Sequence, residues 1–384
     1  MDRDNRRLLD FACKGALFMT ACSVIVTPIC LVEMGKALGI NLTQRGGLES
    51  ARSLPLVVML FACGIIARRI SSAKLIAAGL GLLSVGLCAV GLSGSYPVTI
   101  GAMALMGAGS GFIEGLVNPL IVKLHPENPE HHLNVTHAMY STGVFCCVLI
   151  FGELLNIGVS WRVLYFASAA GTLAIGILFW FASSAFGDAG GKKRGSYTAP
   201  LAVPLFWIVA LAMFFSTGTE AGFTFWTASF IRDYHAAMPR LSGIGTAIFA
   251  GSMAAGRMLI GRLASRYSMR NILLVMSLGG IAVSALVIYA GSVVSVFLLL
   301  AAAGLIVSGF WPSLLAIASR RIHCETTTLF ILIVSSGMGG FGAAPYIMGA
   351  LGDRWGLRGG FLLMPLLFLG TAVLLLSMKN DKDS

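Results

Sequence analysis

Long uncharged stretches separated by short polar segments dominate the pattern along this chain. Ten of them contain at most one Asp, Glu, Lys or Arg, and they cover Gly15–Val32, Leu54–Ala67, Leu75–Ser93, Val98–Val122, Asn134–Gly158, Val163–Gly187, Val203–Ile231, Leu241–Gly261, Asn271–Ala290 and Thr326–Gly352. The segments Ser292–Ser319 and Gly359–Met378 have the same apolar character. About 20 apolar residues are needed to cross the hydrocarbon core of a bilayer as a helix. The pattern therefore predicts an all-α membrane protein with twelve transmembrane helices.

The composition agrees with a chain whose surroundings are mostly lipid. Of the 384 residues, 57% are hydrophobic and 11% are charged, and the mean hydropathy is +0.86. A soluble domain of this length carries roughly 25% charged residues. We therefore exclude a secreted, nucleic-acid-binding or ordinary cytosolic protein. No cofactor is expected, and the histidines His131 and His132 are interpreted as solvated loop residues rather than as metal ligands.

The basic residues predict an orientation. With the N-terminus inside, about eighteen Lys and Arg residues fall on the inner side and about eight on the outer side, and such an excess marks the cytoplasmic face. Met1–Asp10 is a charged leader, and the apolar run after it is long enough to span rather than to be removed as a signal peptide. We expect an integral protein of the cell (inner) membrane with both termini in the cytoplasm.

The chain also repeats itself. A glycine followed by a basic loop occurs after the second span (Gly64–Arg69) and after the eighth (Gly261–Arg266), and the tripeptide Ser-Gly-Phe occurs at 110–112 and at 308–310. Because two unrelated motifs recur at nearly the same separation, we predict two six-helix bundles over residues 1–187 and 201–384, joined by a cytoplasmic linker over 188–200. Paired bundles of this kind are typical of transporters.

On these motifs the sequence resembles the major facilitator superfamily, and a second set of residues resembles its fucose permease branch of fucose–galactose–glucose:proton symporters. In the segment from Gly107 to Gly143, Glu114 is followed by Asn118 and Pro119, as in the fourth helix of that branch. The resemblance implies two pseudo-symmetric bundles, symport of a small sugar and coupling to protons. Two features depart from the branch: Cys22–Leu31 contains no carboxylate, and His137 and Tyr140 stand where the permease has polar amides.

Two glutamates inside the spans are the candidates for proton coupling. Glu114 lies in the fourth span and Glu220 near the middle of the seventh. An ionised carboxylate costs several kcal/mol at this depth, so each must face a cavity, find a partner or bind a proton. The alternative is a structural glutamate, whose carboxylate is hydrogen-bonded by polar groups of neighbouring helices and only stabilises its bundle.

The candidate substrate-binding residues surround these acids. Asn118 follows Glu114, and Thr224 follows Glu220, one helical turn later on the same face. Phe223 and Trp226 form an aromatic stripe that could cover a sugar ring or simply pack in the core. The remaining candidates are His137 and Tyr140 in the fifth span and Trp311 in the tenth, with Glu114 and Glu220 themselves.

The function that these features favour is a secondary active transporter, a proton-coupled symporter of a small sugar or related polar metabolite that works by alternating access. An uncoupled facilitator or an exporter of amphipathic compounds stays open, as does a membrane sensor that does not transport. Sodium is an alternative coupling ion. No motif of a hydrolase or of a nucleotide-phosphate loop is present, so we do not expect an enzyme. The expected partners are the solute, the proton and the bilayer, with no nucleic acid and no second copy of the chain.

Overall fold

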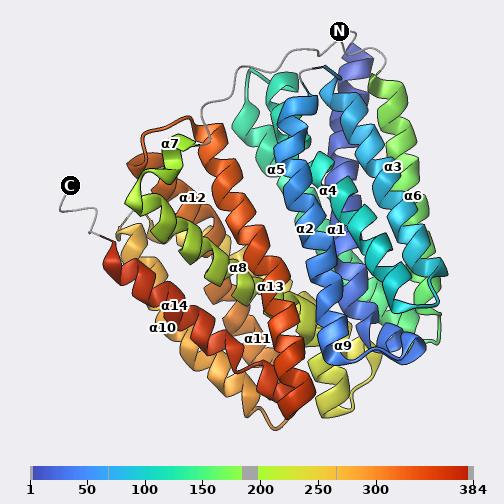
Figure 1. Cartoon of the computed structure of the whole chain (residues 1–384), viewed down its shortest axis with the longest axis vertical. Helices are drawn as coiled ribbons and strands as arrows, with labels where there is room; N and C mark the ends of the chain where they lie inside the picture. The colour runs from blue at the N-terminus through green and yellow to red at the C-terminus, as the bar shows by residue number, and fades with distance from the viewer. Residues whose placement is uncertain (1–2, 68, 184–197, 265, 379–384) are drawn as a thin grey trace. The chain divides into compact units, whose positions relative to one another are not determined.

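The computed structural model describes residues 3–67, 69–183, 198–264 and 266–378, and within these ranges it is helical without a strand (Figure 1). The helices, with a π-helical turn η1, are α1 (Arg3–Leu38), α2 (Leu42–Ile66), α3 (Ser72–Leu92), α4 (Tyr96–Leu124), α5 (Pro129–Asn156), α6 (Trp161–Ser183), α7 (Thr198–Leu201), α8 (Pro204–Ser229), η1 (Phe230–Tyr234), α9 (Pro239–Leu263), α10 (Met269–Ile288), α11 (Val293–Val307), α12 (Phe310–Arg321), α13 (Thr326–Gly360) and α14 (Leu363–Ser377).

The described residues include eleven helical segments that are long and apolar enough to cross a membrane, and a shorter apolar helix, α14. The predicted fold class is therefore confirmed. The predicted tenth span consists of α11 and α12, which form one apolar segment over Val293–Arg321, and Ser308 and Gly309 between them keep α-helical backbone angles. Near the end of α13, Gly356 has a φ of 73°, a left-handed conformation that interrupts regular helical geometry and that glycine adopts without a steric penalty.

The chain forms two compact units. The first contains Met1–Ile40 and Ala51–Lys192, and the second contains Asn41–Ser50 and Lys193–Ser384. The first turns of α2 thus belong to the second unit, and the division into bundles over residues 1–187 and 201–384 stays a prediction. Most of the predicted linker (residues 188–197) lies outside the described residues.

Within the first unit, α1 packs against α5 and α6, while α3 lies beside both α4 and α6 (Figure 1). Glycines bring these helices close. A Cβ on Gly109 of α4 would lie 2.5 Å from the backbone N of Leu83 in α3, and one on Gly143 of α5 would lie 2.7 Å from the Phe18 carbonyl oxygen in α1. Small residues at such crossings are the usual means of packing helices in a bilayer.

Within the second unit, α8 packs against α13 and α14, α9 against α11, and α10 against α14 (Figure 1). The crossing of α8 and α13 is again a glycine contact, since a Cβ on Gly340 would lie 1.9 Å from the Phe214 carbonyl oxygen. The Thr217 hydroxyl donates a hydrogen bond of 2.7 Å to the Gly337 carbonyl one turn away. Glu220 therefore follows directly after the tightest part of this crossing.

The start of α2 is held inside the second unit by one carboxylate of α13. Asp353 accepts hydrogen bonds from the backbone N–H groups of Leu42 (2.8 Å) and Thr43 (2.9 Å) and from the Thr43 hydroxyl (2.5 Å). These N–H groups are at the helix N-terminus, where they have no partner within the helix and where the helix dipole favours a negative charge. Asp353 thus caps α2 from a distant part of the chain.

We expect Asp353→Ala to loosen the first turn of α2. The loss of such a cap costs about 1 kcal/mol, which corresponds to roughly fivefold faster exchange of the amides that it held. Hydrogen exchange followed by mass spectrometry of peptides from residues 40–50 measures this change. Asp233→Ala is the matched control, because Asp233 approaches Arg45 of the same segment at 3.6 Å through a carboxylate that is 39% exposed and holds none of the N-terminal amides of α2. Equal exchange in wild type and Asp353→Ala would contradict the capping role.

Candidate functional site

Glu114 is positioned by the crossing of α4 over α2. Three glycines, Gly107, Gly111 and Gly115, recur every fourth residue on the α4 face that contacts α2. A Cβ on Gly107 would lie 1.9 Å from the Arg52 carbonyl oxygen, so the two backbones touch there. Glu114 follows two turns later, next to Gly115, and its side chain is half-buried. Close packing on α2 therefore sets the place of this carboxylate.

The same crossing supplies Glu114 with a cationic neighbour that the sequence analysis missed. Arg52 is 2% exposed and interacts electrostatically with Glu114. The predicted second span began at Leu54, which left Arg52 in the preceding loop; the helix in fact begins at Leu42, so Arg52 lies well inside it. The available signal was its place directly before an apolar run. A half-buried acid and a buried base thus lie near one another in the first unit.

Asn118 extends this polar interior by one turn of α4. Its Oδ1 atom is buried and has no hydrogen-bond partner among the described residues. A buried amide oxygen that lacks a hydrogen-bond donor destabilises the folded protein by about 1–3 kcal/mol. The position therefore suits a hydrogen-bond donor from a ligand or a water molecule. On α5, which packs against α4, His137 is exposed and Tyr140 is half-buried.

In the second unit, Glu220 is also half-buried and also has a basic neighbour. It interacts electrostatically with Arg257 of α9, an exposed residue. Thr224 lies one turn after Glu220 and is half-buried, whereas Thr227 is 2% exposed and its hydroxyl has no hydrogen-bond partner among the described residues. Each unit therefore pairs one half-buried glutamate with one arginine from a neighbouring helix.

The aromatic stripe of α8 is packed rather than open. Phe223 and Trp226 are both fully buried. The Phe223 ring lies 5.6 Å from that of Phe249 and 6.3 Å from that of Phe361, and the Trp226 indole N–H donates a hydrogen bond of 3.1 Å to the Pro345 carbonyl. The geometry gives these two rings the packing role, and neither has an open face for a sugar ring in this structure.

Trp311 is the second residue of α12. It is half-buried, and its ring would lie 3.2 Å from a Cβ on Gly337 of α13, the residue whose carbonyl accepts the Thr217 hydroxyl. Because Thr217 precedes Glu220 by less than one turn of α8, this tryptophan and Glu220 belong to the same region of the second unit.

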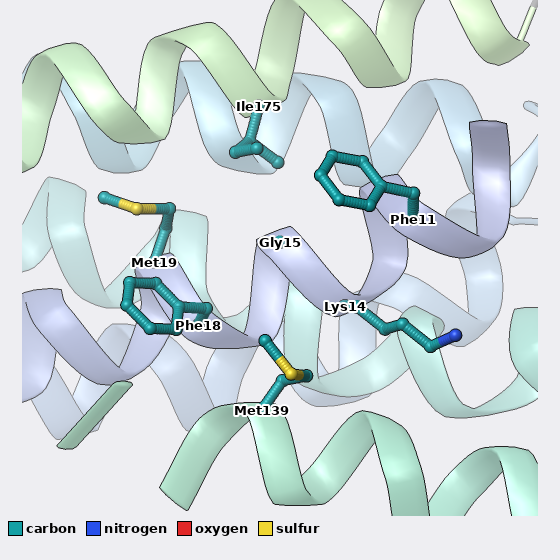
Figure 2. A pocket seen from close by; sticks show the side chains of 7 residues that line it. All are labelled: Phe11, Lys14, Gly15, Phe18, Met19, Met139 and Ile175. Atoms are coloured by element: carbon teal, nitrogen blue, oxygen red, sulfur yellow. The ribbon is translucent and has the colours of Figure 1, made fainter. Parts of the chain in front are cut away.

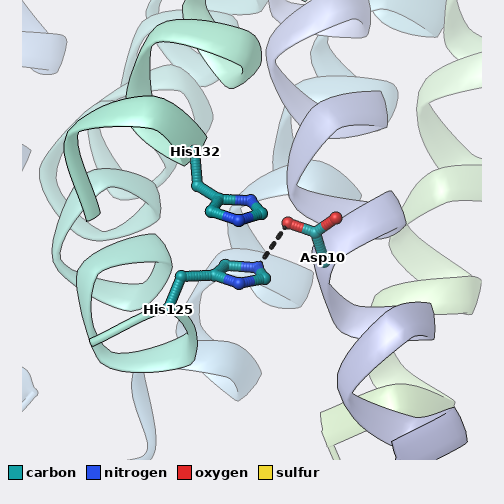
Figure 3. Close-up of side chains that lie close together, drawn as sticks. All are labelled: Asp10, His125 and His132. Atoms are coloured by element: carbon teal, nitrogen blue, oxygen red, sulfur yellow. Dashed lines mark hydrogen bonds and ion pairs between the residues drawn. The ribbon is translucent and has the colours of Figure 1, made fainter. Parts of the chain in front are cut away.

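A further polar cluster gathers Asp10, His125 and His132, whose potential ligand atoms all lie within 4.8 Å of one another (Figure 3). The sequence did not indicate this cluster, because Asp10 is far from the two histidines along the chain. His125 Nε2 lies 2.9 Å from Asp10 Oδ1. The two imidazoles stack at a centroid distance of 3.4 Å and an angle of 5°, and the Lys14 ammonium lies 2.5 Å from Asp10 Oδ2.

This geometry does not fit a metal ion. Metal-binding nitrogens direct their lone pairs in the plane of the ring, and two rings stacked in parallel cannot both do so toward one ion. The Lys14 ammonium already neutralises the carboxylate. Beside the cluster, Arg6 forms an ion pair with Glu127, and a backbone hydrogen bond together with this arginine holds the pKa of the Glu127 carboxyl below its ordinary value. We interpret the cluster as a polar latch between α1 and the connection from α4 to α5.

Comparison with known proteins agrees with the helical architecture. The family model described as Major Facilitator Superfamily matches residues 15–341. Comparison with curated protein sequences gives no match. Among solved structures, a bacterial homologue of the human lysosomal transporter Spinster, in an inward-facing and occupied conformation, superimposes with a TM-score of 0.79 at 15% identity and covers 98% of this chain and 97% of its own. A variant of the nucleoside transporter NupG superimposes with a TM-score of 0.82 at 14% identity, over 96% and 98% of the two chains.

Proposed function

The chain belongs to the Major Facilitator Superfamily, and from this premise we propose that it is a secondary active transporter that couples the movement of a small polar solute to a proton gradient by alternating access. The observation that carries the proposal is the half-buried glutamate of each unit, Glu114 and Glu220, placed near an arginine. Acidic groups inside transmembrane helices are costly, and proton relays are among the functions that retain them.

The proposed coupling depends on the charge of these two acids. An ionised glutamate interacts favourably with its arginine while water has access, but it opposes dehydration of the site. A protonated glutamate is neutral, so it tolerates the dehydrated, closed state. Proton binding and solute binding are then linked, because both favour the state that can close around the solute.

A small sugar or related polar metabolite is the proposed solute class. The polar groups of the first unit are the Asn118 amide, the His137 imidazole and the Tyr140 hydroxyl, and those of the second are Glu220 and the Thr224 hydroxyl. These groups can donate to and accept from hydroxyls. Trp311 is half-buried, so part of its ring can meet a solute, whereas Phe223 and Trp226 support α8 by packing. The similar fold of a nucleoside transporter adds nucleosides, which carry a sugar, to the compounds worth testing.

We further propose that the protein lies in the cell (inner) membrane with both termini in the cytoplasm, as the distribution of basic residues predicts, and that it acts as a monomer. Labelling of single cysteines introduced near either terminus, in intact and in opened cells, tests the orientation.

The transport proposal is tested in two steps. A thermal-shift screen of the purified protein with sugars, nucleosides and other polar metabolites should identify a stabilising solute, because a ligand that binds the native state raises its stability. When the outside of proteoliposomes is more acidic than the inside, the solute concentration inside should then rise above that outside. If only a sodium gradient drives accumulation, the coupling ion is sodium and not the proton. Equilibration that ignores both gradients would indicate an uncoupled facilitator, and binding without movement would indicate a sensor; either result contradicts the proposal.

A further inference from the structure

The first unit contains an apolar crevice of about 380 Å³ on α1 and between α5 and α6, and Glu114 is not among the residues that line it (Figure 2). Apart from one charged residue, Lys14, the residues that line it are apolar. The lining residues are Phe11, Lys14, Gly15, Phe18 and Met19 of α1, Met139 of α5 and Ile175 of α6. Gly15 forms the floor, since a Cβ there would lie 2.8 Å from the end of the Ile175 side chain.

The crevice is open rather than sealed. Phe11 is 61% exposed, and Phe18, Met19 and Met139 are half-buried. Figure 2 shows Phe11 and Ile175 on one side of Gly15 and Met139 on the other, with the Lys14 side chain directed away from the apolar part. All three helices are long enough to cross a membrane, so apolar surface that is exposed on them meets acyl chains rather than water.

Basic and apolar residues alternate along one face of α1 beside this crevice. Arg7, Phe11, Lys14 and Phe18 recur at helical spacing, so they share a face. From Arg7 to Phe18 the helix rises roughly 17 Å, which is enough to reach from the headgroup region into the hydrocarbon. With Arg7 at headgroup depth, the long Lys14 side chain can extend toward the same headgroups, while Phe18 lies at the depth of the acyl chains.

The two basic groups can accept an anionic partner. Arg7 is exposed and has no hydrogen-bonding or ionic partner among the described residues. Lys14 Nζ lies 2.5 Å from Asp10 Oδ2, and its side chain is 24% exposed. An ammonium has three donors, of which that contact uses one, and its long stem lets the charge reach the interface.

From this arrangement we propose that the crevice is a binding site for an anionic phospholipid of the leaflet at the N-terminal end of α1. The phosphate of the lipid binds Arg7 and Lys14, and one acyl chain lies along Phe11, Phe18 and Met139. The two basic side chains favour an anionic headgroup, and the apolar lining favours a molecule with an acyl chain. If the predicted orientation holds, this leaflet is the cytoplasmic one, which carries the anionic lipids that basic pockets between helices bind. The site is separate from the proposed transport site.

Native mass spectrometry of the detergent-purified full chain with added phosphatidylglycerol, phosphatidylcholine or inorganic phosphate tests this proposal. We expect phosphatidylglycerol to bind more tightly than phosphatidylcholine and inorganic phosphate not to bind. Each basic residue near an anionic lipid surface contributes about fivefold in affinity, so Arg7→Gln with Lys14→Gln should remove most of the preference for phosphatidylglycerol. Lys74→Gln is the matched control, because Lys74 is an exposed basic residue at the start of α3 and lies outside the crevice.

A phosphatidylglycerol with a photoreactive acyl chain locates the site independently of the variants. We expect cross-links at Met19 and Met139, and we expect an excess of unlabelled phosphatidylglycerol to suppress them. Equal affinity for the two lipids, a preference that survives in the double variant, binding of inorganic phosphate at the same level, or cross-links confined to other helices would each overturn the proposal. Transport activity does not enter either readout, so failure here leaves the proposed function untouched.

Discussion

Glu114→Gln is expected to abolish accumulation of the solute against its gradient while exchange of labelled for unlabelled solute continues. Glutamine is close to protonated glutamate in shape and charge, so it should allow the closed state but cannot release a proton. Without release, the proton gradient no longer favours movement in one direction. Exchange needs no net proton movement, and it should therefore survive in the same proteoliposomes in which proton-driven uptake falls to the level of protein-free vesicles.

The controls for this experiment lie in the same chain. Glu127→Gln removes a carboxylate from the exposed connection between α4 and α5, and it should leave accumulation unchanged. Glu220→Gln repeats the test in the second unit, where Arg257 is the basic neighbour. If Glu114→Gln and Glu220→Gln both accumulate solute with the wild-type dependence on pH, neither acid couples transport to protons.

Gly107→Ala is expected to lower the stability of the protein by forcing apart two helices of the first unit. The added Cβ would lie 1.9 Å from the Arg52 carbonyl oxygen, a backbone atom that cannot move without separating α2 from α4. Overpacking of this kind costs about 1–3 kcal/mol, which exceeds the gain of about 1 kcal/mol in helix propensity from replacing glycine by alanine. The thermal unfolding midpoint in detergent should fall, and solute binding should weaken because Glu114 follows this crossing.

Gly101→Ala is the matched control on the same helix, since a Cβ there has no atom within 4 Å. It should leave the unfolding midpoint unchanged or raise it. The second unit offers an equivalent pair at adjacent positions: Gly340→Ala meets the Phe214 carbonyl oxygen at 1.9 Å, whereas Gly339→Ala meets only the Phe214 ring at 3.4 Å. A Gly107→Ala protein as stable as the wild type would show that α2 and α4 do not cross this closely.

The helices of the fold were predictable because hydropathy acts locally. A run of about 20 apolar residues is stable as a helix in lipid whatever its neighbours are, so the spans could be identified one by one. The errors fell where a local pattern is ambiguous. The uncharged run that marked the second span began at Leu54, after Arg52, because a charge normally ends such a run, whereas the helix itself begins at Leu42.

The candidate site was predictable only in part. Glu114 and Glu220 became candidates because a carboxylate within an apolar run is too costly to be retained without a partner or a function, and their role in coupling stays a prediction. Helical periodicity placed Phe223 and Trp226 on adjoining faces of the seventh span, but periodicity does not say what covers a face, and in the structure both rings are packed inside the second unit.

By itself the amino-acid sequence determined that this is a helical membrane protein with a repeated half and acidic residues at depth, because these properties follow from the order and chemistry of neighbouring residues. Only the tertiary structure decided which groups meet: Arg52 with Glu114, Arg257 with Glu220, Asp353 with the start of α2, and Asp10 with His125. These partners are far apart along the chain or on different helices. Their meeting depends on how closely and at which residue two helices cross, and that is set by the packing of glycines and side chains across the whole bundle.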